Sequence, residues 1–223
     1  MIYNNIRKGI FIERKNRFIA MVLIDGVLQT VHVKNTGRLK ELLIEGAPVY
    51  LEKSDNPSRK TQYDLISAER EGVIVNIDST APNFVFEEWA KDNYPNAIIK
   101  REKTYKDSRF DCFIDNGDEK IFCEVKGVTL LKNNIAMFPD APTERGIKHI
   151  NGLIDAVKSG YKAKLFFVIR MPDAKSFSPN RRTHREFAES LKCAKDSGVD
   201  IVAYTCKVGK DFIEYDKSVP VIL

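Results

Sequence analysis

The pattern of apolar residues changes once along the chain, at residues 78–83 (DSTAPN). Before this segment, short apolar or alternating runs are separated by turn residues, and only residues 37–43 resemble a short helical piece. The runs predict five or six strands, at residues 10–12, 18–24, 27–33, 48–51, 63–68 and 73–77. Strands this short and this numerous favour a small closed barrel, so we expect an OB-like (oligonucleotide-binding) barrel over residues 1–80.

After residue 83, helical and strand patterns alternate. Ser79 or Thr80 can cap a first helix, and Thr143 can cap a second. Asn116-Gly117, between two apolar runs, is typical of a hairpin turn. Helices are expected at residues 84–90, after residue 143 and at 185–195, and strands at 98–102, 108–115, 120–129, 164–169 and 200–204. This order predicts an α+β or α/β domain over residues 81–223, with a mixed sheet covered by helices.

Composition excludes several classes of protein. The net charge of +5, from 36 basic and 31 acidic residues, permits nucleic-acid binding through local clusters but does not establish it. No apolar run has the length of a membrane span, and the first residues lack the apolar core of a signal peptide, so we expect a cytoplasmic protein of a prokaryote. None of the four cysteines stands in a Cys-x-x-Cys pair, so we expect buried, reduced thiols and no structural zinc.

The main candidate catalytic residues lie in the two strands of the hairpin around Asn116-Gly117. Glu124 and Lys126 share one face of the second strand, and Asp111 of the first strand can approach Glu124. Two carboxylates suffice for Mg²⁺ or Mn²⁺ in metal-assisted phosphodiester cleavage, with Lys126 orienting a water or neutralising the phosphate. Glu88 of the preceding helix is expected to add a third carboxylate. The alternative is a solvated cross-strand ion pair, which contributes only about 0–1 kcal/mol.

Basic and polar residues form several candidate DNA contacts. Arg145 and Lys148 share a face near the start of the helix that follows Thr143, where phosphate binds well. His149 beside them is interpreted as structural, as most lone histidines are. The loops of the first half contribute Arg14, Arg17, His32, Asn35, Arg38, Arg59 and Lys60. Ordinary solvated loops remain the alternative, and because no aromatic platform is visible, the expected DNA contacts are sequence-nonspecific.

Several of these segments resemble the sugar fermentation stimulation protein A family. Residues 138–149 (FPDAPTERGIKH) resemble its most specific signature, and residues 108–111 (SRFD) and 123–130 (CEVKGVTL) resemble its acidic strands. Residues 78–83, 32–39 and 54–60 resemble its linker and N-terminal motifs. Lys34 and Ala81 depart from the family pattern, outside the acidic strands. The resemblance implies an OB-like domain, a PD-(D/E)xK nuclease-like domain, and DNA binding linked to the regulation of sugar metabolism.

These observations leave two hypotheses for the function. The first is a DNA-binding protein with a working metal-dependent nuclease site. The second is a non-catalytic, sequence-nonspecific DNA-binding regulator on a nuclease-like scaffold. A small-molecule enzyme has no supporting phosphate loop, nucleotide fingerprint or nucleophile triad in the sequence. The target, the strandedness of the DNA and the oligomeric state stay open, with a homodimer among the alternatives.

Overall fold

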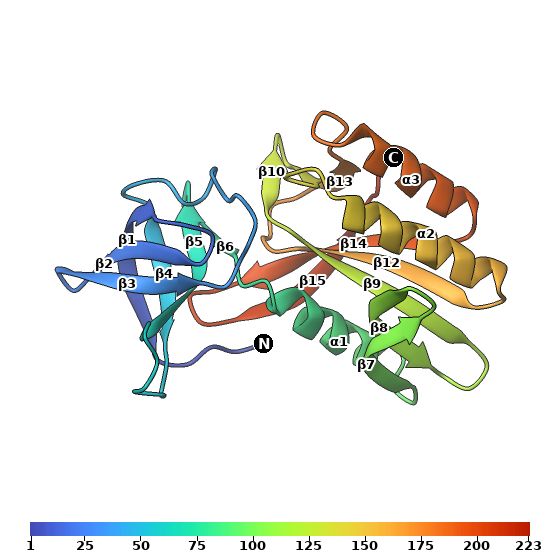
Figure 1. Cartoon of the computed structure of the whole chain (residues 1–223), viewed down its shortest axis with the longest axis horizontal. Helices are drawn as coiled ribbons and strands as arrows, with labels where there is room; N and C mark the ends of the chain where they lie inside the picture. Colours follow the sequence, from blue (N-terminus) through green and yellow to red (C-terminus); the bar gives the residue numbers. More distant parts are fainter.

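The first half of the chain closes into a barrel in the computed structural model, which describes residues 1–223 (Figure 1). Its strands are β1 (Ile6–Arg14), β2 (Ile19–Ile24), β3 (Val27–Val33), β4 (Pro48–Lys53), β5 (Tyr63–Arg70) and β6 (Val73–Asn76). They follow the order β3-β2-β1-β4-β5-β6, and a β3–β5 pairing at His32↔Asp64 and Val33↔Leu65 closes the barrel. The alternating strand residues fill its interior. The predicted OB-like barrel is confirmed.

The prediction of a short helical piece at residues 37–43 is wrong. The segment is a turn, in which the backbone N–H groups of Leu42 and Leu43 both donate to the carbonyl of Leu39. Leu39 has a φ of 50°, in the left-handed region, which cannot continue a right-handed helix. Leu39 and Leu42 are both buried in the core. Their spacing of three residues therefore reflects two anchors of one turn rather than a helical face.

The second half forms a mixed six-stranded sheet covered by helices on both faces (Figure 1). Its strands follow the order β15-β14-β12-β9-β8-β7, where β7–β8–β9 are antiparallel and β9, β12 and β14 run parallel. Their bounds are β7 (Ile98–Tyr105), β8 (Ser108–Asp115), β9 (Lys120–Val128), β12 (Lys162–Ile169), β14 (Asp200–Val208) and β15 (Ile213–Val219). The predicted mixed α/β arrangement is confirmed.

The three helices divide between the two faces of this sheet. Helix α1 (Ala81–Asn93) packs through Phe86 and Trp89 against apolar side chains of one face, including Cys123 and Val125 of β9. Helices α2 (Glu144–Lys158) and α3 (Arg185–Asp196) cover the opposite face, toward which Phe122 of β9 points. Successive residues of a strand point to opposite faces, so the two faces of β9 pack against different helices.

The predicted cap of α2 is confirmed, because the Thr143 hydroxyl accepts a hydrogen bond from the Gly146 N–H at 3.1 Å. Helix α1 begins differently. Thr80 is its N-cap residue but makes no side-chain cap, and Asp78 Oδ1 instead accepts from both the N–H and the hydroxyl of Thr80. The hairpin at Asn116-Gly117 is also confirmed, with Gly117 at a φ of 93°.

One small sheet is not predicted by the sequence pattern. Strands β10 (Leu130–Lys132), β11 (Ile135–Phe138) and β13 (Ser176–Pro179) pair in that order, and β11 runs parallel to β13. Each strand has only three or four residues, too few for a periodicity to stand out. The parallel partners lie about 40 residues apart in the chain, so only the tertiary fold brings them together.

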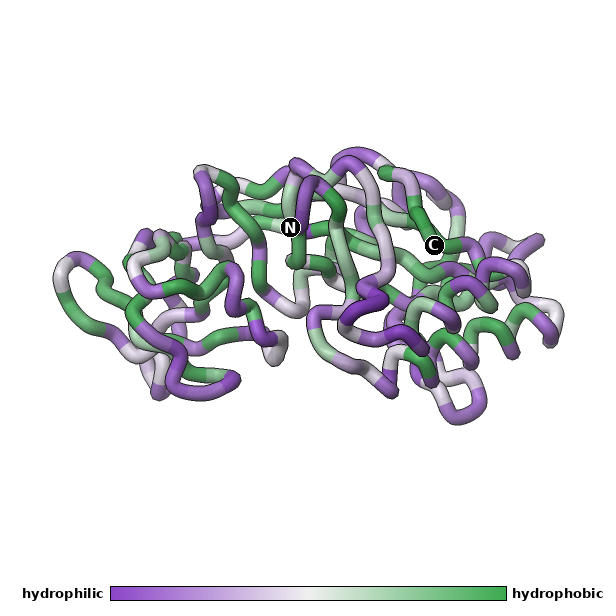
Figure 2. The backbone as a smooth tube through the Cα atoms, turned by 90° about the horizontal axis from the view of Figure 1, so that it is seen from above, coloured by the Kyte–Doolittle hydropathy of each residue, from purple (hydrophilic) through white to green (hydrophobic).

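The barrel and the α/β domain are joined by direct contacts. The backbone N–H of Asn76 donates to the Arg170 carbonyl, and Arg170 Nη1 donates to the carbonyl of Asp78 at 2.9 Å. The N-terminal segment runs along the α/β domain, where the Tyr3 N–H donates to the Asp211 carbonyl. Figure 2 shows hydrophobic stretches within both domains and hydrophilic stretches at many of the outer turns.

Three of the four thiols are buried, as expected, at Cys112, Cys123 and Cys206, while Cys193 on α3 is exposed. All four are free thiols. None of the helices has the length and apolar character needed to cross a membrane.

Candidate active site

The acidic residues of the β8–β9 hairpin meet where the ladder between these strands ends. Cys112 faces Cys123 in the last paired position, and beyond it the Asp111 carboxylate accepts the N–H of Val125 at 2.8 Å. The Asp111 side chain thus takes a backbone donor of β9 beside Glu124. The sequence-based expectation that Asp111 and Glu124 approach one another across the hairpin agrees with this geometry.

Glu124 is almost completely buried, with 1% of its surface exposed. Its Oε1 accepts from Lys126 Nζ and lies 2.5 Å from Nδ1 of His149, whereas its Oε2 is buried with no hydrogen-bond partner. Burial raises the pKa of Glu124, but the His149 hydrogen bond and the Lys126 ammonium outweigh it and lower the pKa below its usual value. The carboxylate is therefore ionised and has one oxygen atom left unpaired.

Asp111 has the opposite shift. Burial, followed by the negative charge of Glu124, raises the pKa of Asp111, and the hydrogen bond from the Val125 N–H opposes this only in part. A raised pKa on one member is the expected sign of two carboxylates that share a site. Bringing a cation between Asp111 and Glu124 would remove this repulsion.

His149 joins this group, although the sequence analysis interpreted it as structural. It is buried, and it lies on α2 in the same face as Ile150 and Leu153, above the strand that carries Glu124. The ring packs edge-on against Phe110, with centroids 6.1 Å apart. The available signal was its position four residues before Leu153, which places a titratable ring on the apolar face of the helix.

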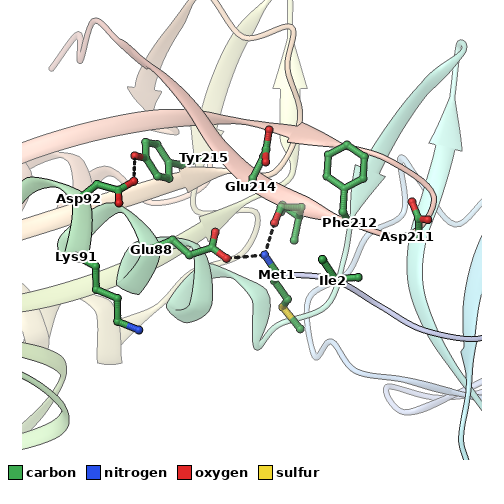
Figure 3. A pocket seen from close by; sticks show the side chains of 10 residues that line it. Met1, Ile2, Glu88, Lys91, Asp92, Asp211, Phe212, Glu214 and Tyr215 are labelled. Atoms are coloured by element: carbon green, nitrogen blue, oxygen red, sulfur yellow. Dashed lines mark hydrogen bonds and ion pairs between the residues drawn. The ribbon is translucent and has the colours of Figure 1, made fainter.

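Glu88 does not join the site, which corrects the expectation of a third carboxylate. Its Oε1 accepts from the amino group of Met1 at 2.7 Å, as Figure 3 shows. It lines a cavity of about 900 Å³ between α1 and β15, together with Asp92 and Tyr215. Because α1 covers the face of β9 opposite to Glu124, the sheet separates this large cavity from the paired carboxylates.

Models of two families match most of the chain. Residues 12–77 match the SfsA N-terminal OB domain, and residues 80–212 match the sugar fermentation stimulation protein RE domain. The sugar fermentation stimulation protein homologue of Ruminiclostridium cellulolyticum is 56% identical, and that of Clostridium beijerinckii is 52% identical, each over all of both chains. The chain belongs to the sugar fermentation stimulation protein (SfsA) family.

A solved SfsA structure has the same fold. Pyrococcus furiosus SfsA, described as a complex with Ca²⁺, is 30% identical and superposes with a TM-score of 0.90, covering 100% of this chain and 98% of that one. The membership expected from the sequence motifs is thereby confirmed over the full length. The arrangement of barrel and α/β domain is shared by this SfsA structure.

Four of the residues expected to contact DNA are instead used inside the barrel domain. Arg14 donates to five backbone carbonyls, of Asn16, Arg17, Asn35, Gly37 and Arg38. The Asn35 amide donates to the Ile77 carbonyl and its oxygen accepts from the Gly37 N–H. Arg59 forms a bidentate ion pair with the Asp64 carboxylate, and His32 Nδ1 lies 3.0 Å from the same carboxylate. These side chains hold the barrel loops together and are only partly accessible.

The other five have exposed side chains with no hydrogen bond or ion pair inside the molecule. Arg17 and Arg38 line a cavity of about 500 Å³, which Ala141 and Pro142 close from the α/β domain. Pro142 precedes the cap of α2, and exposed Arg145 and Lys148 follow in the first turns of that helix. Lys60 stands apart in the loop between β4 and β5. The free basic residues thus come from both domains, and four of the five lie on segments that meet at the start of α2.

Proposed function

We propose that this SfsA-family protein binds DNA and cleaves it with a divalent metal held by Asp111 and Glu124. The observation that carries the proposal is the buried Oε2 of Glu124, which has no partner although it belongs to an ionised carboxylate. A buried carboxylate oxygen without a hydrogen-bond partner is costly, so such an atom is suited to take a cation. Asp111, with its raised pKa, lies beside it.

The residues present fit a hard metal ion such as Mg²⁺ or Mn²⁺. No three His, Cys, Asp or Glu side chains converge on one metal position in the structure, so among these side chains the ligands would be the two carboxylates. Mg²⁺ commonly keeps several waters and binds through one or two carboxylates. Bound there, the metal would polarise a phosphate and lower the pKa of a water ligand. The Ca²⁺ complex of the Pyrococcus furiosus relative supports an affinity for divalent metals.

The order of elements supports a PD-(D/E)xK nuclease-like domain. Helix α1 is followed by the antiparallel strands β7, β8 and β9, then by α2 and the parallel strand β12. In that architecture, Asp111 and the Glu124-Val125-Lys126 segment would supply the two carboxylates and the lysine of the site. The Lys126 ammonium, paired with Glu124 and only partly exposed, can neutralise charge on a phosphate or orient the attacking water.

DNA binding rests on the exposed basic side chains of both domains. Arg17 and Arg38 of the barrel lie at the segment before α2, Arg145 and Lys148 lie in the first turns of α2, and His149, the residue after Lys148, contacts Glu124. A phosphate backbone lying along this path would present its scissile bond to the carboxylates. No base-reading element accompanies the path, so we infer sequence-nonspecific binding.

A thermal-shift titration with Mn²⁺ or Mg²⁺ tests the site. Metal binding to the folded state stabilises it by about 2.7 kcal/mol at a hundredfold excess over Kd. In a chain of this size each 1 kcal/mol raises Tm by roughly 2–4 °C. Asp111→Asn and Glu124→Gln should abolish the shift and any metal-dependent DNA cleavage. In the apo protein, Asp111→Asn should be equally or more stable because the repulsion is gone, whereas Glu124→Gln should be less stable because it removes the charge that His149 and Lys126 stabilise. Lys126→Ala should lose cleavage.

Glu88→Gln is the matched control, because Glu88 is a carboxylate of the same domain on the other side of the sheet. It should keep the full metal shift. If the Tm of the parent protein does not change in millimolar Mn²⁺ and Mg²⁺, the proposed metal site is wrong. The alternative, a non-catalytic DNA-binding protein on the same scaffold, would then be favoured.

A further inference from the structure

The carboxylate of Glu124 receives both of its hydrogen bonds on one oxygen. Lys126 reaches Oε1 from within β9, and His149 reaches the same atom from α2, 25 residues further along the chain. Oε2 receives neither. Because a carboxylate oxygen accepts, the imidazole donates to it from Nδ1.

Two donors from different elements define the orientation of a carboxylate better than one. A lysine on the same strand is a flexible point charge, and Lys126 keeps 17% of its side chain exposed. The His149 side chain is only 8% exposed, and its ring is held edge-on against Phe110. His149 is therefore the rigid partner, and its bond leaves Oε2 as the atom available to a cation.

The close approach of α2 to β8 secures this position. A Cβ atom at Gly152 would lie 3.0 Å from both Phe110 Cζ and Ser108 Oγ, so the helix packs here at a distance that a larger residue could keep only if these side chains shifted. Gly152 lies three residues after His149, on the same side of the helix. The helix therefore brings the imidazole down onto the sheet instead of leaving it in solvent.

We propose that His149 is a positioning residue, which orients Glu124 through Nδ1 so that Oε2 is presented to the divalent metal. The inference rests on the proposed metal site and adds to it the residue that sets its affinity. Partners that hold metal ligands in place typically change metal affinity by about 10–100-fold when they are lost.

Calorimetric titration of the full-length protein with Mn²⁺ tests this role in a pair of variants. The amide nitrogen of asparagine can take the place of Nδ1, so His149→Asn keeps a donor to Glu124, whereas His149→Leu removes it. We expect His149→Leu to weaken Mn²⁺ binding by about 10–100-fold and His149→Asn to stay within a few-fold of the parent. The Tm of each metal-free variant reports separately on folding.

His184→Leu is the matched control, since His184 is equally buried and near α2 but contacts the N–H of Thr143 rather than Glu124. It should lower Tm without changing the affinity for Mn²⁺. Parent-like Mn²⁺ binding by His149→Leu would overturn the positioning role and leave the metal site standing, as would an equal loss of affinity in His149→Asn and His149→Leu. A parent that binds no Mn²⁺ would overturn both the site and the role of His149.

Discussion

Two buried carboxylates remain ionised in this protein for different reasons. Glu124 has two donors on one oxygen and a free second oxygen, which suits a ligand. Asp64, in the barrel, has both oxygens occupied by Arg59, and His32 and Lys34 lie within 3.3 Å of them. Burial raises the pKa of Asp64, but the hydrogen bonds from Arg59 and His32 outweigh it and lower the pKa to about 2. Asp64 is therefore satisfied within the fold and serves stability.

Replacing Asp64 should give a pH-dependent loss of stability. The folded-state pKa lies below the unfolded one, so the stabilisation is complete above about pH 4 and disappears as the pH falls toward about 2. We expect Asp64→Asn to lower the free energy of unfolding by about 1–2 kcal/mol at pH 6, and the deficit to shrink between pH 4 and 3. Urea unfolding across this range measures it. Asp25→Asn, in an exposed turn, should show no such trend, and a deficit for Asp64→Asn that stays constant with pH would contradict the assignment.

At the scale of elements, Arg14 shows how a basic loop residue can serve structure. Its guanidinium lies at the end of β1 and donates to carbonyls in the turn before β2 and in the segment after β3. Burial, followed by the charge of Arg17, lowers the pKa of Arg14. Arg38 lies in the same region, but its exposed side chain makes no bond within the molecule. One arginine holds the loops in place and the other is free to bind.

Alanine substitutions should separate these roles. Arg14→Ala should destabilise the protein by about 2–3 kcal/mol, because several charge-assisted hydrogen bonds are lost together. Arg38→Ala should leave the free energy of unfolding within about 0.5 kcal/mol of the parent and weaken DNA binding. Urea unfolding and fluorescence anisotropy with a labelled duplex measure the two effects. Equal stability of the two variants would show that the carbonyl bonds of Arg14 contribute nothing.

At the scale of the molecule, the arrangement of the two domains brings exposed basic residues of both domains together. These residues, which we call the basic path, are Arg17, Arg38, Arg145 and Lys148. Arg17 and Arg38 meet the segment before α2 only because bonds such as Asn76 to Arg170 and Arg170 to Asp78 hold the barrel against the α/β domain. The net charge of +5 is small for a chain of 223 residues, so the proposed DNA binding depends on such a local cluster of basic side chains.

DNA affinity should therefore depend on salt and on both domains. The logarithm of the binding constant should fall linearly with the logarithm of salt concentration, with a slope near −0.9 per neutralised phosphate. The double variants Arg17→Ala/Arg38→Ala and Arg145→Ala/Lys148→Ala should each reduce that slope by about two. Lys91→Ala, on the far face beside Glu88, should leave it unchanged. Strong discrimination between unrelated duplexes, or a full slope in either double variant, would contradict this path.

The sequence by itself determined what depends on neighbours within one element. Alternation and turn residues predicted the barrel strands, the hairpin at Gly117 and the cap at Thr143, and the side-chain period of two brought Glu124 and Lys126 to one face. These features follow from backbone geometry over a few residues, so local patterns suffice to predict them.

Only the tertiary structure decided which polar side chains are free and which are already bonded. The packing of α2 against β8 brought His149 to Glu124, and the placement of α1 on the opposite face removed Glu88. Arg14 and Asn35 donate to backbone carbonyls of other segments. Such contacts join residues far apart in the chain, and a side chain bonds whichever group packing brings within about 3 Å of it. No periodicity within a segment carries that information.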